Sequence, residues 1–197
     1  MILSIFMNNV GYKGQKLDHR KLIKQCLKNN QLAQQMLFDT FHTRMYNLCM
    51  SYLANHHDAE DVLVDSFTKV FRNLSKFQYR GDDSLTKWIS TIVINESIRL
   101  LNRRKPIKFE EDMATVHSIE VSDDIISNME AKELYAMIEK LPAGYRTIFN
   151  LYVIEGYSHK EIAEMLRISQ NTSKSQLSKA RKYLINKIKE EVSYENA

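Results

Sequence analysis

The chain has 197 residues, a formal net charge of +4 and only two cysteines. This length allows one domain or two small ones, and the modest charge excludes a protein that coats nucleic acid in bulk. Cys26 and Cys49 are too few for a disulfide framework, which favours a reducing, cytoplasmic setting. The apolar start MILSIFM is far shorter than a membrane span and lacks the basic flank of a signal peptide, so no membrane insertion is expected.

The charge is distributed unevenly along the chain. Residues 1–105 carry a net charge of +7, residues 106–128 carry −5 and residues 129–197 carry +2. Only five glycines and two prolines occur, and long segments have helical periodicity, which predicts an almost all-α protein. We therefore expect two small basic helical domains joined by a flexible acidic linker. The expected boundaries are 16–105 for the first domain, 106–127 for the linker and 128–190 for the second domain.

Two helices are expected first, over Leu17 to Leu27 and Leu32 to Leu53. His42 and Cys49 lie in or beside the apolar stripe of the second helix. A metal site built from them is one interpretation, but buried structural side chains are the commoner use of such residues. The apolar stripe of this helix consists of Met36, Leu37, Phe41, Met45, Leu48 and Tyr52.

The next helix, expected from about Asp58 to Leu74, separates acidic from apolar residues. Its core stripe is Leu63, Phe67, Val70, Phe71 and Leu74, and the opposite side carries Asp58, Asp61 and Asp65. Acids near a helix N-terminus each stabilise it by about 0.3–1 kcal/mol. Two other interpretations are a docking face for a basic partner and a metal or acid–base site that includes His56 and His57. The metal site would need further ligands and a pocket, for which the sequence gives no sign.

The polar loop FQYRGDDS leads into a helix expected from Ser84 to about Arg104. Trp88, Asn95 and Arg99 share one face of that helix. An aromatic ring, an amide and a guanidinium on one face suit single-stranded nucleic acid, because bases stack on the ring while cations hold phosphates. The alternative is that Trp88 belongs to the core.

A helix-turn-helix is expected from Glu155 to Leu184, after helices over about 128–141 and 142–154. Ser158 and Glu161 have the spacing of a capping box, which starts the first helix. The turn is expected at Arg167 to Ser169, with Ser169 as the N-cap of the second helix. Arg167 stands where such turns often have glycine, and a left-handed backbone there would cost about 1–2 kcal/mol.

The second helix of this motif has a polar, basic outer face. Its inner face consists of Leu177, Ala180, Leu184 and Ile188, and its outer face of Asn171, Thr172, Ser175, Ser178, Lys179 and Lys182, with Lys174 and Gln176 at the borders. No acid occurs between Glu164 and Glu190. A face of this kind suits the major groove of DNA, and an ordinary solvated helix pair is the alternative.

In their order and spacing, three segments resemble the extracytoplasmic-function (ECF) class of bacterial sigma factors. They are DAEDVLVDSFTKVF, SLTKWISTIVINESIRLLNRRK and LPAGYRTIFNLYVIEGYSHKEIAEMLRISQNTSKSQLSKARKYL, and the resemblance covers roughly residues 31–188. It implies two helical domains that serve as the promoter-specificity subunit of RNA polymerase, with promoter DNA as duplex and melted single strand and core RNA polymerase as partners.

The resemblance also implies a role for particular residues. The helix that carries Asp58, Asp61 and Asp65 would dock on the coiled coil of the large polymerase subunit. The downstream promoter element would be melted and held by Tyr79, Arg80, Trp88, Asn95, Arg99 and Arg103. The upstream element would be read as duplex by Asn171, Thr172, Lys174, Ser175, Gln176, Lys179 and Lys182. Asn171, Ser173 and Gln176 depart from the residues that are common in relatives, which leaves the upstream base preference open.

We expect a binding protein rather than an enzyme, without a cofactor, because no nucleophile–base pair, phosphate-binding glycine loop or metal cluster is recognisable. An anti-sigma protein that covers the acidic face or clamps the two domains together is a further expected partner. One alternative is a two-domain helix-turn-helix regulator that does not bind polymerase. A more remote one is a small metal-dependent enzyme that uses His56, His57, Asp58 and Asp61.

Overall fold

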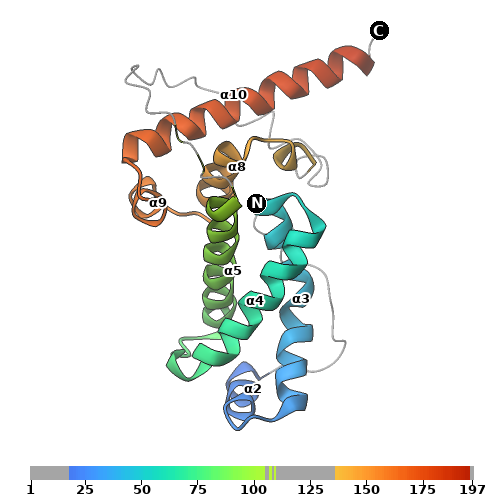
Figure 1. The fold of residues 1–197 in the computed structure, drawn as a ribbon, viewed down its shortest axis with the longest axis vertical. Coiled ribbons are helices and arrows are strands. Elements are labelled where there is room, and N and C mark those ends of the chain that lie inside the picture. Colours follow the sequence, from blue (N-terminus) through green and yellow to red (C-terminus); the bar gives the residue numbers. More distant parts are fainter. Residues whose placement is uncertain (1–17, 105–106, 108, 110–135, 196–197) are drawn as a thin grey trace. The chain divides into compact units, whose positions relative to one another are not determined.

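The computed structural model describes residues 18–104, 107, 109 and 136–195, and all regular structure in these ranges is helical (Figure 1). The all-α prediction is therefore confirmed. Contacts divide the chain into two units, one holding residues 18–104 and the other the described residues from 136 onward. The expected linker, apart from residues 107 and 109, and most of the helix expected at 128–141 lie outside the described residues.

The first unit consists of α2 (His19–Cys26), α3 (Gln31–Leu53), α4 (His56–Asn73), the short 3₁₀ helix η1 (Leu74–Lys76) and α5 (Asp82–Arg104). The limits of the four α-helices lie within two residues of those predicted. Asp18, Asn30 and Asn55 cap the first three, since each side chain accepts a backbone N–H three residues on.

The core of this unit lies between α3, α4 and α5. Its fully buried side chains include Leu37, Met45, Tyr52, Val70, Leu85, Ile89, Val93 and Ile94. Cys49 is also completely buried, and burial raises the pKa of its thiol to about 12 although the Ser97 hydroxyl opposes the shift. His42 is exposed on the same helix. The two side chains therefore do not face one another as metal ligands.

The second unit contains α8 (Ala143–Phe149), its π-helical continuation η2 (Asn150–Ile154), α9 (His159–Leu166) and α10 (Gln170–Glu195). Its buried core includes Ile138, Ile148, Phe149, Leu151, Ile162, Leu177, Ala180 and Leu184. Arg146 of α8 is buried too, and its guanidinium donates to the carbonyl oxygens of Glu139 at 2.8 Å and Leu141 at 2.9 Å. These bonds satisfy carbonyls at the end of the preceding helical turn.

Helices α9 and α10 form the predicted helix-turn-helix. Ser158 and Glu161 make the reciprocal bonds of a capping box, so α9 begins as expected. Arg167 ends α9 in the left-handed conformation, with φ 56° and ψ 46°. The Ser169 hydroxyl then accepts the Thr172 N–H at 2.9 Å, which starts α10. No helix among the described residues is long and apolar enough to cross a membrane.

Candidate functional site

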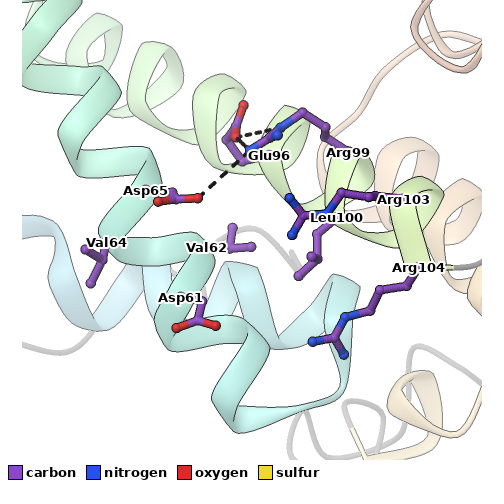
Figure 2. Close-up of a pocket in the computed structure, with 9 residues that line it drawn as sticks. All are labelled: Asp61, Val62, Val64, Asp65, Glu96, Arg99, Leu100, Arg103 and Arg104. Carbon is purple, nitrogen blue, oxygen red and sulfur yellow. Dashed lines mark hydrogen bonds and ion pairs between the residues drawn. The ribbon is translucent and has the colours of Figure 1, made fainter.

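A groove with a volume of about 350 Å³ lies between α4 and α5 in the first unit (Figure 2). Asp61 and Asp65 project from α4, each with a side chain that is 66% exposed. Arg99 and Arg103 enter the groove from α5. The structure thus brings together the acids predicted to bind polymerase and two cations predicted to contact the downstream promoter element. Between the acids, Val64 exposes 61% of its surface.

Glu96 is a buried carboxylate in the wall of this groove, and the sequence analysis missed it. Lys69 of α4 forms an ion pair with it. Arg99 donates to its Oε2 through Nη2 at 2.5 Å and Nε at 2.9 Å, and the same Nη2 lies 3.9 Å from Asp65 Oδ2. A buried charge needs such partners. The i,i+3 spacing of Glu96 and Arg99 was the available signal, but the contribution of Lys69 required the packing of α4 on α5.

The Glu96 ion pairs predict a pH dependence of stability. Burial acts to raise the pKa of Glu96, but the hydrogen bonds from Lys69 and Arg99 outweigh it and leave the pKa below its usual value. The carboxylate therefore stabilises the fold above its unfolded pKa of about 4.3, and this stabilisation is lost as the pH falls through the lower folded pKa. Glu96→Gln should cost about 1–3 kcal/mol at pH 7, and the variant should lose less stability than the wild type as the pH falls below the unfolded pKa of a glutamate.

Urea unfolding followed by the fluorescence of Trp88, the single tryptophan of the chain, reports on this unit alone. The exposed carboxylate of Asp39 on α3 offers a matched control, Asp39→Asn, which should retain the wild-type pH profile. A Glu96→Gln protein with the same stability and the same pH profile as the wild type would contradict the assigned role.

Asp58 does not belong to the exposed acidic face, so this part of the prediction is wrong. Its residue surface is 6% exposed, and it is ion-paired with Arg104 at the end of α5, with Nη1 2.5 Å from Oδ2. Its place in the first turn of α4 also favours a negative charge there. Asp58 thus joins the start of α4 to the end of α5.

The neighbouring histidines have separate partners. The Tyr46 hydroxyl lies 2.7 Å from His56 Nδ1, and His57 Nε2 lies 3.8 Å from Asp61 Oδ2. Together with the pairing of Asp58, these contacts direct the side chains of the suggested metal-dependent enzyme to different places. Within the described ranges, no group of three or more His, Cys, Asp and Glu side chains is arranged to hold a metal ion.

The predicted melting surface lies on α5 and the loop before it. Trp88 is half-buried, and its ring packs on Phe77 with centroids 5.0 Å apart, while Asn95 is exposed two turns further along α5. Trp88 is therefore neither a fully buried core residue nor fully free. Its ring contacts Phe77, and the residue keeps part of its surface exposed.

Short contacts fix the loop beside Trp88. The Ser84 hydroxyl accepts the Arg80 N–H at 3.0 Å and donates to the Gly81 carbonyl at 2.6 Å. Gly81 has φ 117°, a backbone conformation that strongly favours glycine. Tyr79 is half-buried, and the guanidinium carbon of Arg20 on α2 lies 5.4 Å from the centre of its ring. The loop is therefore tied both to the start of α5 and to α2.

The predicted outer face of α10 is only partly exposed. Asn171, Lys174 and Lys182 are exposed, and Lys179 is half-buried. The prediction is wrong for three residues of the set, since Thr172, Ser175 and Gln176 are 4%, 7% and 2% exposed. The hydroxyl of Thr172 lies 2.8 Å from that of Ser169, and Ser175 donates to the Thr172 carbonyl at 3.0 Å.

Helix α10 packs on both α8 and α9, and Gln176 lies next to the Ala180 side of its buried stripe. Thr172 and Ser175 lie on the opposite side of the helix, in its first two turns. His159 at the start of α9 adds to this packing, because its Nδ1 lies 2.9 Å from the Ser173 hydroxyl and its ring stacks on Tyr152 at 4.4 Å. Burial, with the nearby charges of Lys174 and Arg181, lowers the pKa of His159, which favours the neutral ring.

Comparison with known proteins identifies both units. The family model described as "Sigma-70 region 2" matches residues 37–107, and that described as "Sigma-70, region 4" matches residues 131–184. The chain is 29% identical to the ECF RNA polymerase sigma factor SigW of Bacillus subtilis (strain 168), over 84% of this chain and 94% of SigW. It is 27% identical to the ECF RNA polymerase sigma-E factor of Salmonella typhimurium (strain 14028s / SGSC 2262), over 88% of this chain and 96% of that protein.

Among solved structures, one titled "Structure of CnrH in complex with the cytosolic domain of CnrY" matches with a TM-score of 0.48 and 21% identity, over 86% of this chain and 96% of that chain. The family assignment depends on the two region matches, which do not overlap and together cover more than half of the chain. The two relatives are also similar to this chain over nearly the whole length of each relative. The chain belongs to the ECF class of RNA polymerase sigma factors.

Proposed function

We propose that this protein binds core RNA polymerase and directs it to promoters, as an alternative sigma factor that acts in transcription initiation. The observation that carries the proposal is the match of two sigma-factor regions to two separately packed helical units. The polymerase supplies the chemistry of RNA synthesis, and this chain supplies recognition. Because core polymerase works in the cytoplasm, we place the protein there.

The first domain, 16–105, is proposed to dock on the polymerase and open the downstream promoter element. Asp61 and Asp65 are exposed and flank the exposed side chain of Val64, so they form a surface with both charge and apolar area. An anti-sigma protein that covered this surface would block docking. The melted strand would be held by Tyr79, Arg80, Trp88, Asn95, Arg99 and Arg103.

The second domain, 128–190, is proposed to bind the upstream element as duplex, and 106–127 to be the acidic linker between the domains. The exposed side chains of Asn171, Lys174 and Lys182 support a contact with the major groove and its phosphates, with Lys179 beside them. Thr172, Ser175 and Gln176 are proposed to position α10 rather than to contact bases, since they are buried.

Reconstitution tests the proposed function. Tagged protein should co-purify with core RNA polymerase from the source bacterium, and the reconstituted holoenzyme should start transcripts at defined promoters from which core enzyme alone gives none. A truncated chain without the second domain is the matched control, and it should keep polymerase binding but lose the dependence on the upstream element. Purified protein that fails to associate with core polymerase would overturn the proposal.

A further inference from the structure

Helix α2 has a strongly basic solvent face to which none of the roles above gives a function. Its buried face consists of Leu22, Ile23 and Cys26. All four cations on the helix and its end are exposed: Arg20, Lys21, Lys24 and Lys28. Asp18, the N-cap, is the single acid between residues 18 and 30. None of the four cations forms an ion pair with another described residue.

Unpaired like charges at i,i+4 spacing destabilise an isolated helix by about 0.2–0.5 kcal/mol per pair. Arg20 and Lys24 stand at this spacing within α2, and Lys28 follows four residues later in the turn after the C-cap Leu27, so the three cations form a row. The row therefore weakens the helix unless an anionic partner is present. A solvated surface would more commonly mix charges of both signs, as α4 and α5 do across their groove.

One end of this row reaches the loop that is proposed to capture the melted strand. The guanidinium of Arg20 lies over the ring of Tyr79, 5.4 Å from its centre, a distance at which a cation–π interaction is attractive. Figure 1 shows α2 at the same end of the unit as the turn between α4 and α5. A strand that leaves the loop can therefore pass directly onto the basic row, whereas the acidic groove lies further along α4 and α5.

We infer that the row formed by Arg20, Lys24 and Lys28, with Lys21 beside it, is a second contact surface for the melted promoter strand, which it binds through phosphates. The inference rests on the proposed function, since it extends the strand's path beyond the loop. Lysine side chains bind phosphates as point charges without reading bases, so this surface adds affinity that is independent of sequence and sensitive to salt. Arg20 has a double role, because it also holds Tyr79.

The test uses holoenzyme reconstituted with core polymerase and a fluorescent single-stranded oligonucleotide that carries the downstream element of a promoter it transcribes. Lys24→Gln with Lys28→Gln removes two cations, and the double variant with arginine at both positions preserves the charge. For single strands the logarithm of affinity falls with that of salt concentration by about 0.7 per phosphate contact. For the Gln variant, the slope of log affinity against log salt concentration should therefore be smaller by about 1.4. If the two proteins bind equally at 1 M salt, this difference makes the variant bind about 25-fold more weakly at 0.1 M salt.

The arginine variant should bind like the wild type, and Gln25→Ala, an exposed position on the same helix, should also leave binding unchanged. A Gln variant with wild-type affinity and salt slope would overturn the inference and leave the proposed function intact. A Gln variant that loses core polymerase instead would also overturn it, because α2 would then be a protein-docking surface. Wild-type holoenzyme that does not bind the strand at all would reject the proposed melting function together with the inference.

Discussion

Asp61→Lys combined with Asp65→Lys is expected to abolish binding to core RNA polymerase while the protein stays folded. Each side chain is 66% exposed, and their contacts to His57 and Arg99 are 3.8 and 3.9 Å long, so the fold should lose under about 1 kcal/mol. A partner with a basic surface would meet two cations where it fits two anions, and like-charge juxtaposition across an interface costs several kcal/mol. Pull-down of core polymerase measures the binding, and circular dichroism measures whether the variant stays folded.

A control with the same change in net charge comes from Asp39→Lys combined with Glu164→Lys. Both residues are exposed, Asp39 on α3 and Glu164 on α9, and neither lines the groove. This control should bind polymerase nearly as the wild type does. If the Asp61 and Asp65 variant folds and still binds polymerase, the groove is not the docking surface, and if both double variants fail equally, the effect is one of net charge.

The local structure of this chain was largely predictable, because it follows from neighbours in the sequence. Apolar periodicity predicted where most described helices begin and end, and capping residues predicted the starts of α9 and α10. Arg167 is informative here, since the sequence has it where such turns often have glycine, and the structure has it in the left-handed conformation at φ 56°. The remaining contacts of α9 and α10 offset the cost of this left-handed backbone, which is about 1–2 kcal/mol.

Contacts between residues distant in the sequence were not predictable in the same way. The periodicity of α4 placed Asp58 among the acids of its outer face, but Arg104 reaches it from 46 residues further along the chain. The same holds for Glu96, whose burial depends on Lys69 and Arg99. In both cases a charged residue enters the interior with a partner that periodicity does not reveal.

The outer face of α10 shows a different limit. A helical wheel assumes one neighbour and one buried stripe, whereas α10 packs on both α8 and α9. The wheel therefore identified Leu177, Ala180 and Leu184 as core correctly but missed Gln176, which is 2% exposed. A residue at the border of a predicted face is the one most affected by a second packing partner.

Helix α5 connects the two activities proposed for the first domain. It runs unbroken for 23 residues, with Trp88 and Asn95 in its first two-thirds and Arg99 and Arg103 beside the acidic groove. At 1.5 Å per residue, Trp88 and Arg99 are about 16 Å apart along a rigid rod. Docking through the groove would therefore also fix where the stacking surface stands relative to the polymerase, without any movement inside the domain.

The role of Trp88 can be separated from its packing by the size and chemistry of its replacement. Trp88→Leu keeps apolar bulk against Phe77 but removes the aromatic face, whereas Trp88→Phe keeps a ring. If bases stack on Trp88, the leucine variant should lose about 1–3 kcal/mol of affinity for the melted strand, which is about 5- to 150-fold, and the phenylalanine variant should lose much less. The anisotropy of a labelled single strand gives the affinity of each reconstituted holoenzyme for the strand, and thermal melting gives the stability of each variant.

Asn95→Ala provides the matched comparison, because Asn95 is exposed and its replacement should not change the melting temperature. It should impair transcription from duplex promoters more than binding to polymerase, since an amide at this position can pair with an unstacked base only after the strands open. A premelted promoter template should restore much of the activity of the Asn95→Ala and Trp88→Leu variants, because the cost of opening is then already met. If both Trp88 variants lose strand affinity only in proportion to lost thermal stability, Trp88 is a packing residue and the strand is captured elsewhere on the loop.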